Sequence, residues 1–244
     1  SATVDYALKF GVLGALMAWF GVGVPGQVML LPRVTVTLLL TALGVGLALA
    51  GLLSRKQGGP PVRPRQPPKI WVVTGSVDNT YRESTFEDLY RRSIYVMWRR
   101  SSPYPSFVNF DATDRAQCRV KRSRTNTALQ ALTLMNDPVY VEMAVVLAGR
   151  LATAEVDDDA SDNDAGRIEH AFRHVLSRRP TAAEQAELRR ALVEERARLA
   201  ADPESVSEIV AGYATPAGLE PSEHAAWFHV AMILLNLDET ITKG

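Results

Sequence analysis

The chain has 244 residues, and its 27 basic and 27 acidic side chains leave it without net charge at neutral pH. This balance excludes a general affinity for polyanions, so nucleic acid is not an expected partner. A single cysteine, Cys118, excludes an intramolecular disulfide and any metal site that needs several thiolates.

The N-terminal residues are predicted to form a membrane anchor. Residues 34–54 carry no charged side chain, and roughly 20 apolar residues in a helix can cross a bilayer. A second apolar segment, residues 6–24, comes before them. We therefore expect a transmembrane helical hairpin over residues 1–54. Two alternatives stay open: a signal peptide or interfacial helix for the first segment, and a buried core helix for the second.

Small residues in both apolar segments suit close contact between helices. Pairs of small residues four positions apart occur at Gly11 and Ala15, Gly44 and Ala48, and Gly46 and Ala50. This spacing lets two membrane helices approach closely, although small residues are also common in membrane helices generally. The six positions are predicted to pack against a partner helix in the membrane.

Residues 55–83 are predicted to be a proline-rich linker and loop. Five prolines lie within residues 57–69, and proline fixes φ and removes a backbone donor. Residues 70–73 follow as a candidate short strand. The remainder, residues 84–244, is predicted to be an irregular all-helical soluble domain, so the fold class is mainly α.

The first helix of this domain is predicted to begin with a capping box at Ser84 and Glu87 and to run to about Arg100. Pro103 and Pro105 would end it. Residues 107–111 alternate in polarity and are predicted to be a short extended piece.

Five further helices are predicted from apolar periodicity and capping residues. Asp137 and Pro138 are typical of an N-cap and a first helical residue, Thr181 and Glu184 form a second capping box, and Ser222 is the expected cap of the last helix. The predicted helices span residues 129–135, 138–153, 165–176, 181–201 and 223–236.

A basic stretch is the main candidate contact surface of the soluble part. Its members are Arg115, Arg119, Lys121, Arg122 and Arg124. No aromatic residues alternate with them, which disfavours nucleic acid. We expect them to contact anionic lipid head-groups or an acidic protein partner, or to pair with carboxylates of the chain itself.

No catalytic residue, cofactor or metal is assigned. His170 and His174 lie one helical turn apart, a spacing that suits zinc, but no third ligand is evident. The acidic residues 155–164 lack the regular spacing and glycine of an EF-hand calcium loop. Cys118 has no histidine near it in the sequence and is predicted to be a half-buried structural residue.

Four blocks in order carry a resemblance to a known family. They are residues 51–69 (GLLSRKQGGPPVRPRQPPK), 89–111 (LYRRSIYVMWRRSSPYPSFVNFD), 124–139 (RTNTALQALTLMNDPV) and 234–239 (LLNLDE). Over residues 47–244 the chain resembles the C-terminal part of the planctomycete-type PSD1 domain, also described as DUF1553. Members of that family are typically large exported proteins that also carry a cytochrome-c-like module and a DUF1549 domain, and no reaction is established for them.

The chain departs from that pattern in its N-terminal part. It contains no Cys-x-x-Cys-His motif, and the resemblance stops upstream of about Gly51. We therefore expect a remnant of the family domain fused to a membrane anchor in the bacterial inner membrane.

The first functional hypothesis is a non-catalytic accessory subunit of a larger membrane complex, with membrane lipid and other subunits as partners. A respiratory or photosynthetic electron-transfer complex is a candidate host by analogy. The alternative is a tethered remnant of an exported enzyme or binding protein that acts on polysaccharide. Basic residues after the second span favour a cytoplasmic domain, and a periplasmic one stays open.

Overall fold

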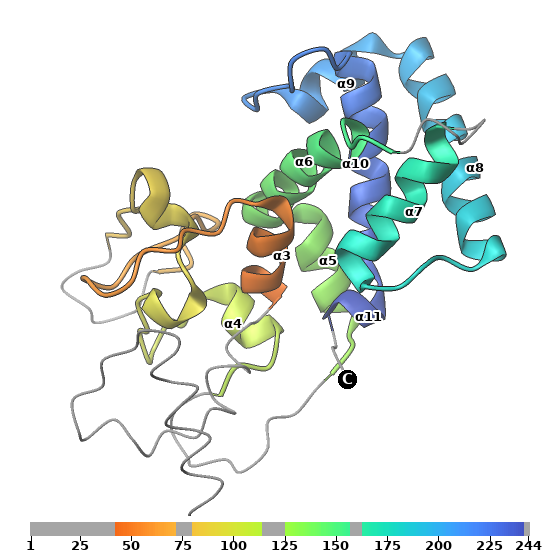
Figure 1. The fold of residues 1–244 in the computed structure, drawn as a ribbon. Helices are drawn as coiled ribbons and strands as arrows, with labels where there is room; N and C mark the ends of the chain where they lie inside the picture. The colour runs from red at the N-terminus through yellow and green to blue at the C-terminus, as the bar shows by residue number, and fades with distance from the viewer. Residues whose placement is uncertain (1–41, 72–79, 114–124, 157–162, 242–244) are drawn as a thin grey trace, which may run out of the picture. The chain divides into compact units, whose positions relative to one another are not determined.

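The computed structural model describes residues 42–71, 80–113, 125–156 and 163–241, all of which belong to one unit, Leu39–Gly244. These residues are mainly helical (Figure 1). Among them, strand-like pairing is limited to two isolated bridges, Ser54 with Arg91 and Val62 with Val96. The predicted mainly α fold is confirmed for this part of the chain.

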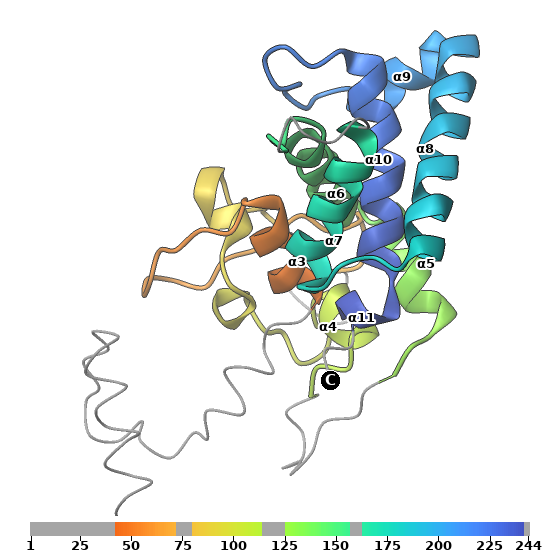
Figure 2. The same cartoon turned by 45° about the vertical axis from the view of Figure 1, so that its right-hand side comes forward.

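The C-terminal part of the described chain is a helical core built around one central helix. Its members are α5 (Ala128–Asn136), α6 (Pro138–Ala152), α7 (Asn163–Leu176), α8 (Ala182–Ala201), α9 (Pro203–Val210), α10 (Pro221–Asn236) and α11 (Asp238–Ile241). Helix α10 packs against α5, α6, α8 and α9, and Figure 2 shows it between α6 and α8. Its side chains Trp227, Val230 and Leu234 are fully buried, so α10 supplies much of the apolar surface that holds the core together.

Local capping explains where these helices begin. Asp137 accepts a hydrogen bond from the Val139 amide, and Pro138 is the first residue of α6. Thr181 and Glu184 form the predicted capping box of α8. The predictions of α5 to α8 and α10 are thus confirmed in type. Ser222 is not the cap of α10, because the helix already begins at Pro221, with Glu220 at the N-cap position. Helix α9 was not predicted.

Helix α3 (Ala42–Ala50) is the described part of the segment predicted to cross the membrane. Leu43, Leu47 and Ala50 are buried in the same core as α6, on which α3 packs. Gly51 follows with a φ of 76°, the left-handed conformation that commonly ends a helix. These residues are therefore a core helix of the domain, the alternative left open above. The rest of the predicted hairpin, residues 1–41, lies outside the described residues.

No single helix of the described residues is long and apolar enough to cross a bilayer. The pair α5 and α6 reaches the required length and composition together, but the two helices meet at an angle of 66°. Most side chains of α6 are buried inside the domain.

The helix predicted over residues 84–100 is wrong. The chain forms two short 3-10 turns there, η1 (Phe86–Tyr90) and η2 (Ser93–Tyr95). The Ser84 hydroxyl accepts from the Arg63 amide (2.9 Å) instead of capping a helix. Backbone groups of this segment pair with a distant one: the Val62 amide donates to the Tyr95 carbonyl and the Met97 amide to the Val62 carbonyl, each at 2.8 Å. Long-range hydrogen bonds thus replace the local ones of a helix.

Two shorter predictions also fail. Residues 107–111 are not extended, because Pro105 begins the short helix α4 (Pro105–Asn109) instead of ending an earlier one. Ile70 and Trp71 lie in a turn instead of a strand, and residues 72–73 are outside the described part. In α4, Phe107 packs on aromatic side chains: it stacks on Trp98, with ring centroids 5.4 Å apart, and meets Tyr104 edge-on.

Candidate functional site

Three blocks that are far apart in the sequence meet near the N-terminal end of α5, in what we call the motif junction (Asp111, Thr125, Asn126, Gln130 and Asp238). The Asp111 carboxylate accepts from the amide and the hydroxyl of Thr125, at 2.8 and 2.7 Å. Asn126 Nδ2 donates to Asp238 Oδ1 (2.8 Å). The buried Gln130 side chain donates to the Asn109 carbonyl (2.8 Å). The junction joins α4, α5 and α11 and fixes both ends of the basic segment between residues 113 and 125.

Helix α5 turns large apolar side chains to solvent. Leu129, Leu132 and Met135, which we call the α5 stripe, are 56, 53 and 45 % exposed. Residues at this spacing share one face of a helix. Val108, 59 % exposed, belongs to α4, whose Asn109 donates to the Thr133 hydroxyl of α5. Contiguous exposed apolar surface of this kind is typical of protein interaction sites.

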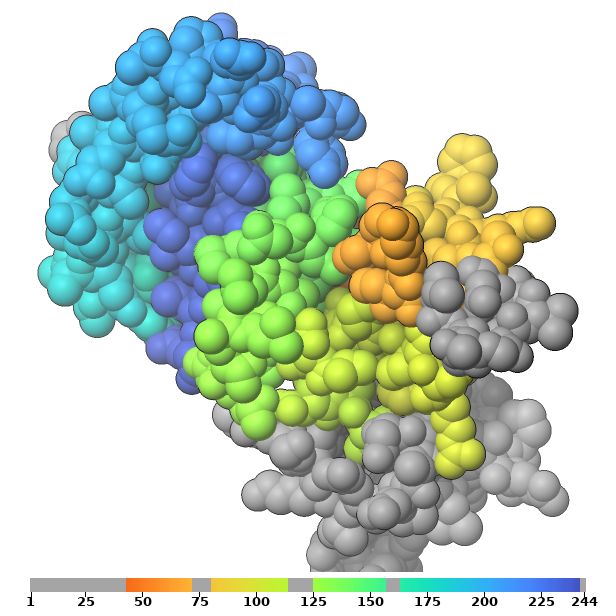
Figure 3. Space-filling view, turned by 180° about the vertical axis from the view of Figure 1, so that it is seen from behind, coloured from red at the N-terminus to blue at the C-terminus, as the bar shows by residue number. Residues whose placement is uncertain are grey.

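An apolar groove lies on α10, the helix against which α5 packs. It has a volume of about 390 Å³. Its lining comes from α7, α8, α10 and the residue after α10: Phe172, Ala183, Glu184, Glu187, Leu188, Ile233, Leu234 and Leu237. Figure 3 shows α10 recessed between α8 on one side and the α5–α6 segment on the other. The α5 stripe and the groove therefore lie on neighbouring elements.

Glu142 is the buried carboxylate of α6. Its Oε1 accepts from the Tyr90 hydroxyl (2.7 Å), and its Oε2 lies 3.3 Å from Arg65 Nη1. Burial, helped by the bond to Glu142, raises the pKa of Tyr90 to about 12. Tyr90 thus keeps its proton at neutral pH and acts as a hydrogen-bond donor. The cluster links α6 to two separate loop segments.

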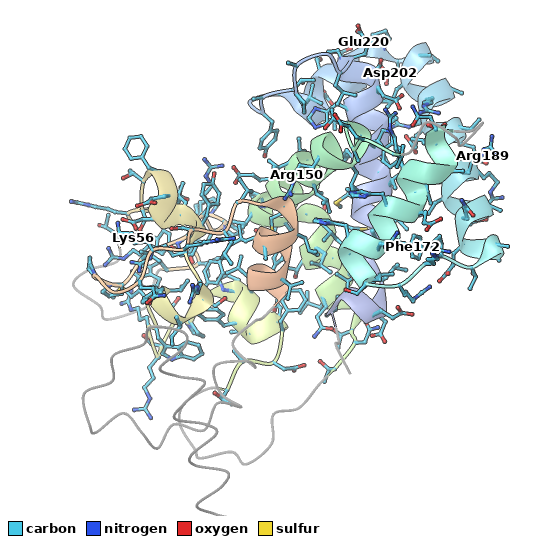
Figure 4. All side chains as sticks on the ribbon, in the orientation of Figure 1. Lys56, Arg150, Phe172, Arg189, Asp202 and Glu220 are labelled. Carbon is cyan, nitrogen blue, oxygen red and sulfur yellow. The ribbon has the colours of Figure 1, made fainter. Side chains whose placement is uncertain are left out.

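Arg91 is a fully buried cation in the part of the chain between α3 and α5, residues 51–71 and 80–113, which we call the irregular region. Its guanidinium donates to the carbonyls of Lys56 and Gly58 and lies over the Tyr95 ring, 4.0 Å from the centroid. Figure 4 shows Lys56 among the loop segments, apart from the helical core. Arg91 therefore holds the first of the four sequence blocks against the second.

Two of the histidines, His174 and His224, bind backbone carbonyls of other helices. His174 Nε2 donates to the Leu49 carbonyl (2.9 Å), which ties α7 to α3, and the His170 ring stacks on that of His174. Burial lowers the pKa of His170. His224 Nε2 donates to the Val145 carbonyl (2.8 Å). Among the described residues, no group of three or more His, Cys, Asp or Glu side chains is placed to hold a metal ion.

The small residues of α3 pack inside their own domain. A Cβ at Gly46 would lie 2.6 Å from Met143 Sδ, so glycine is what allows α3 this close to α6. Gly44 and Ala50 are also buried, whereas Ala48 is exposed. Arg150 of α6 donates to the Leu49 carbonyl (3.0 Å), and Figure 4 shows it beside the end of α3. This packing against α6 differs from the predicted contact with a partner helix in the membrane.

Several predicted residues lie outside the described part of the chain. Gly11 and Ala15 belong to residues 1–41, and Cys118 and the basic residues Arg115, Arg119, Lys121 and Arg122, together with Arg124, belong to residues 114–124. Of the acidic loop, Asp164 is described: it opens α7 and binds Arg196 (2.9 Å), which lowers the pKa of its carboxyl.

Sequence reasoning missed the α5 stripe and the Glu142 cluster for different reasons. The stripe is visible as apolar residues three apart, but the same spacing predicts a buried face. Glu142 interrupts an otherwise apolar helix, which signals a special role, yet its partners are 52 and 77 positions away in the sequence.

The fold and these contacts define a mainly helical domain in which distant sequence blocks are joined by hydrogen bonds. The family model described as "PSD1: Protein of unknown function (DUF1553)" matches residues 44–192, more than half of the chain. The chain therefore belongs to the PSD1 (DUF1553) family. The match begins within α3 and ends within α8, so it includes most of α3 and the second half of the segment 34–54 that was predicted to cross the membrane. Comparisons with curated proteins and with solved structures found no match.

Proposed function

We propose that the chain is a non-catalytic accessory subunit of a larger membrane protein complex, and that it binds a partner subunit through the α5 stripe and the neighbouring groove. The observation that carries the proposal is the exposure of Leu129, Leu132 and Met135 on one helix face. Burying such side chains against a partner removes apolar area from water, which favours association.

The polar groups of the domain support a structural role. Glu142, Arg91, His174 and His224 all hold one segment of the chain to another. Groups engaged in this way are positioned to stabilise the fold.

The charge of the sequence next to the stripe indicates the chemistry of the partner. The five basic residues between positions 115 and 124 come directly before Thr125 and the start of α5. A complementary partner surface would have an apolar ridge that packs on the α5 stripe and a border of acidic side chains that faces the basic residues. The apolar residues 6–24 are the proposed membrane anchor, and an electron-transfer complex stays the candidate host by analogy.

The test compares two surface variants of the full chain in native membranes. The variant L129S/L132S removes the α5 stripe. The control V193S removes a side chain of similar exposure, 54 %, from α8. After mild solubilisation and separation by size, we expect the wild type and V193S to migrate with a constant set of other subunits. Co-migration of L129S/L132S should fall by about tenfold or more.

Three results would contradict the proposal. The wild type could migrate alone, or L129S/L132S could retain its partners as well as V193S does. The chain could also bind vesicles of anionic lipid through the α5 stripe while no subunit co-migrates, which would make lipid the partner. The charge variant R119E/R122E tests the acidic border and should weaken co-migration without changing the thermal midpoint of unfolding.

A further inference from the structure

Four basic side chains gather where the end of α3 meets α6 and α7. Arg150 is in the last turn of α6, and His170, Arg173 and His174 belong to α7. Arg173 and His174 come three and four positions after His170, so the three share one face of the helix. Arg150 and His174 both donate to the Leu49 carbonyl of α3, at 3.0 and 2.9 Å, and therefore lie next to each other. We call these four residues the α3-end cluster.

His170 lies close to the other three members. Its ring stacks on that of His174, with ring centroids 6.1 Å apart and planes inclined by 9°. Burial lowers the pKa of His170, and the positive charges of His174, Arg173 and Arg150 lower it further. Basic groups on two helices therefore act on one imidazole.

The carboxylates of the neighbouring helices are engaged elsewhere. Helix α3 contains no charged residue, and the one carboxylate of α6, Glu142, binds Tyr90. The carboxylates of α7 and α11 each pair with another side chain: Asp164 with Arg196, Glu169 with Arg179, Asp238 with Asn126 and Glu239 with Arg178. Within the part of the chain that the structure describes, Arg150, His170 and Arg173 thus have no ion-pair partner.

The end of α3 explains two members of the cluster. A helix C-terminus favours nearby cations, and Arg150 and His174 bind its carbonyl. His170 and Arg173 are exposed, and among the described residues neither side chain makes a hydrogen bond. Two further basic groups beside the first two repel them, which is unfavourable without a negative partner. A bound anion would remove that repulsion.

We propose that the α3-end cluster binds a phosphate group, with Arg150 and Arg173 as charged donors and His170 as a third donor once it is protonated. A guanidinium presents its N–H groups in a planar fork that matches two phosphate oxygens. Arg150 uses one of its donors on the Leu49 carbonyl and keeps the others for a ligand. The phosphate belongs to an anionic lipid head-group or is a free phosphate ion. This site is independent of the α5 stripe and of the proposed partner subunit.

Phosphate binding and proton uptake by His170 are linked. Protonation gives His170 a positive charge and a further donor, so phosphate should bind more tightly as the pH falls through its pKa, which lies below 6.5. By the same linkage, bound phosphate raises the pKa of His170. The pKa of this one side chain therefore reports on the site.

The test follows the imidazole NMR signals of the isolated full chain in a neutral detergent, and H170Q assigns the signal of His170. Inorganic phosphate is the probe for the free ion, and glycerophosphoglycerol is the probe for a lipid head-group. At about 20 mM, one of them should raise the pKa of His170 by about 0.5 or more above its value in sodium chloride of equal ionic strength, which is about a threefold preference for the protonated form. A rise with inorganic phosphate alone assigns the free ion, and a rise with the diester assigns the head-group.

Two arginine variants make the test specific to this cluster. R173Q should weaken binding of the probe by about threefold or more at a pH where His170 is protonated. It should not lower the thermal midpoint of unfolding without ligand, because Arg173 has no ion-pair partner among the described residues. The matched control R190Q removes the same charge from an exposed position on α8, where Arg190 pairs with Glu187, and should bind like the wild type. Equal binding by R173Q and R190Q would overturn the proposal. So would a pKa of His170 that neither probe raises above its value in sodium chloride.

Discussion

The helical core and the irregular region that precedes it are stabilised in different ways. In the core, formed by α3 and by residues 125–156 and 163–241, helices bury apolar faces against one another. In the irregular region, residues 51–71 and 80–113, apolar side chains such as Phe107 and Phe110 join the same core, and polar side chains also hold the backbone of distant segments. Most helices of the core carry a local sequence pattern that predicts them. The conformation of the irregular region depends instead on contacts between segments that are distant in the sequence.

This difference predicts different responses to damage. Loss of apolar volume in the core should lower the stability of the whole domain, because every helix shares that core. Loss of one polar contact in the irregular region should free a local segment and leave the core folded. Substitutions in the two regions therefore test whether they are one cooperative unit or two.

The largest effect is expected from Trp227→Ala. Trp227 is fully buried on α10, and its Nε1 donates to Glu223 (2.9 Å). Removing so large a core side chain costs about 3–5 kcal/mol. Denaturant unfolding of the full chain should show this loss in the transition followed by helical circular dichroism. The neighbouring half-buried Phe228 provides the control, and Phe228→Ala should lose clearly less. Equal losses would show that the packing around α10 is looser than the structure indicates.

A smaller effect, confined to the irregular region, is expected from Arg91→Met. The methionine keeps the apolar bulk but leaves the carbonyls of Lys56 and Gly58 without their donor, a loss of about 1–3 kcal/mol. Hydrogen exchange should quicken at the Ser54 and Val62 amides, which pair with residues 90 and 95.

Amide hydrogen exchange in α6 and α10 distinguishes local opening of the irregular region from unfolding of the whole domain. With Arg91→Met, amides in these two helices should keep their wild-type protection if the irregular region opens alone. Arg92→Met, at an exposed neighbouring position, should change neither region. Faster exchange throughout α6 and α10 would mean that the two regions unfold together.

The same contrast explains which helices could be predicted from the sequence. Asp137 with Pro138, and Thr181 with Glu184, carry their capping information within four residues, so α6 and α8 were predicted from local pattern. Ser84 and Glu87 present the same local signal, yet the Ser84 hydroxyl binds the amide of Arg63, 21 positions away. A capping pattern therefore predicts a helix only where no distant donor competes for the cap.

Apolar runs were ambiguous for a related reason. The length and composition of residues 34–54 suit a membrane span and a buried core helix equally. What separates the two is the packing of Gly46 on Met143, almost 100 positions later. Parts of the candidate site were hidden in the same way, because the groove on α10 and the motif junction each join segments that are separated in the sequence.

The smallest effect is expected where Arg178, in the loop between α7 and α8, joins α8 to α11 through partly exposed ion pairs. Arg178 binds Glu184 of the α8 capping box (2.7 Å) and Glu239 of α11 (2.8 Å). Arg178, with help from the Thr181 amide, lowers the pKa of Glu184 from 4.5 to about 2. The folded state therefore binds fewer protons than the unfolded state between these two values, and stability falls as the pH drops from 4.5 towards 2.

Arg178→Gln should remove part of this pH dependence. The wild type should exceed the variant in thermal midpoint above pH 4.5, and the difference should shrink as the pH falls towards and below 2, because Glu184 becomes protonated in both proteins only below that value. High salt should also reduce it, because both side chains of the pair are partly open to solvent, each 35 % exposed. Arg173→Gln removes an equal charge from an exposed position on α7 and controls for net charge. A difference between wild type and Arg178→Gln that stays constant down to pH 2 would show that Arg178 stabilises the helix ends by packing on Phe172, where its guanidinium lies 5.3 Å from the ring centroid, instead of by charge.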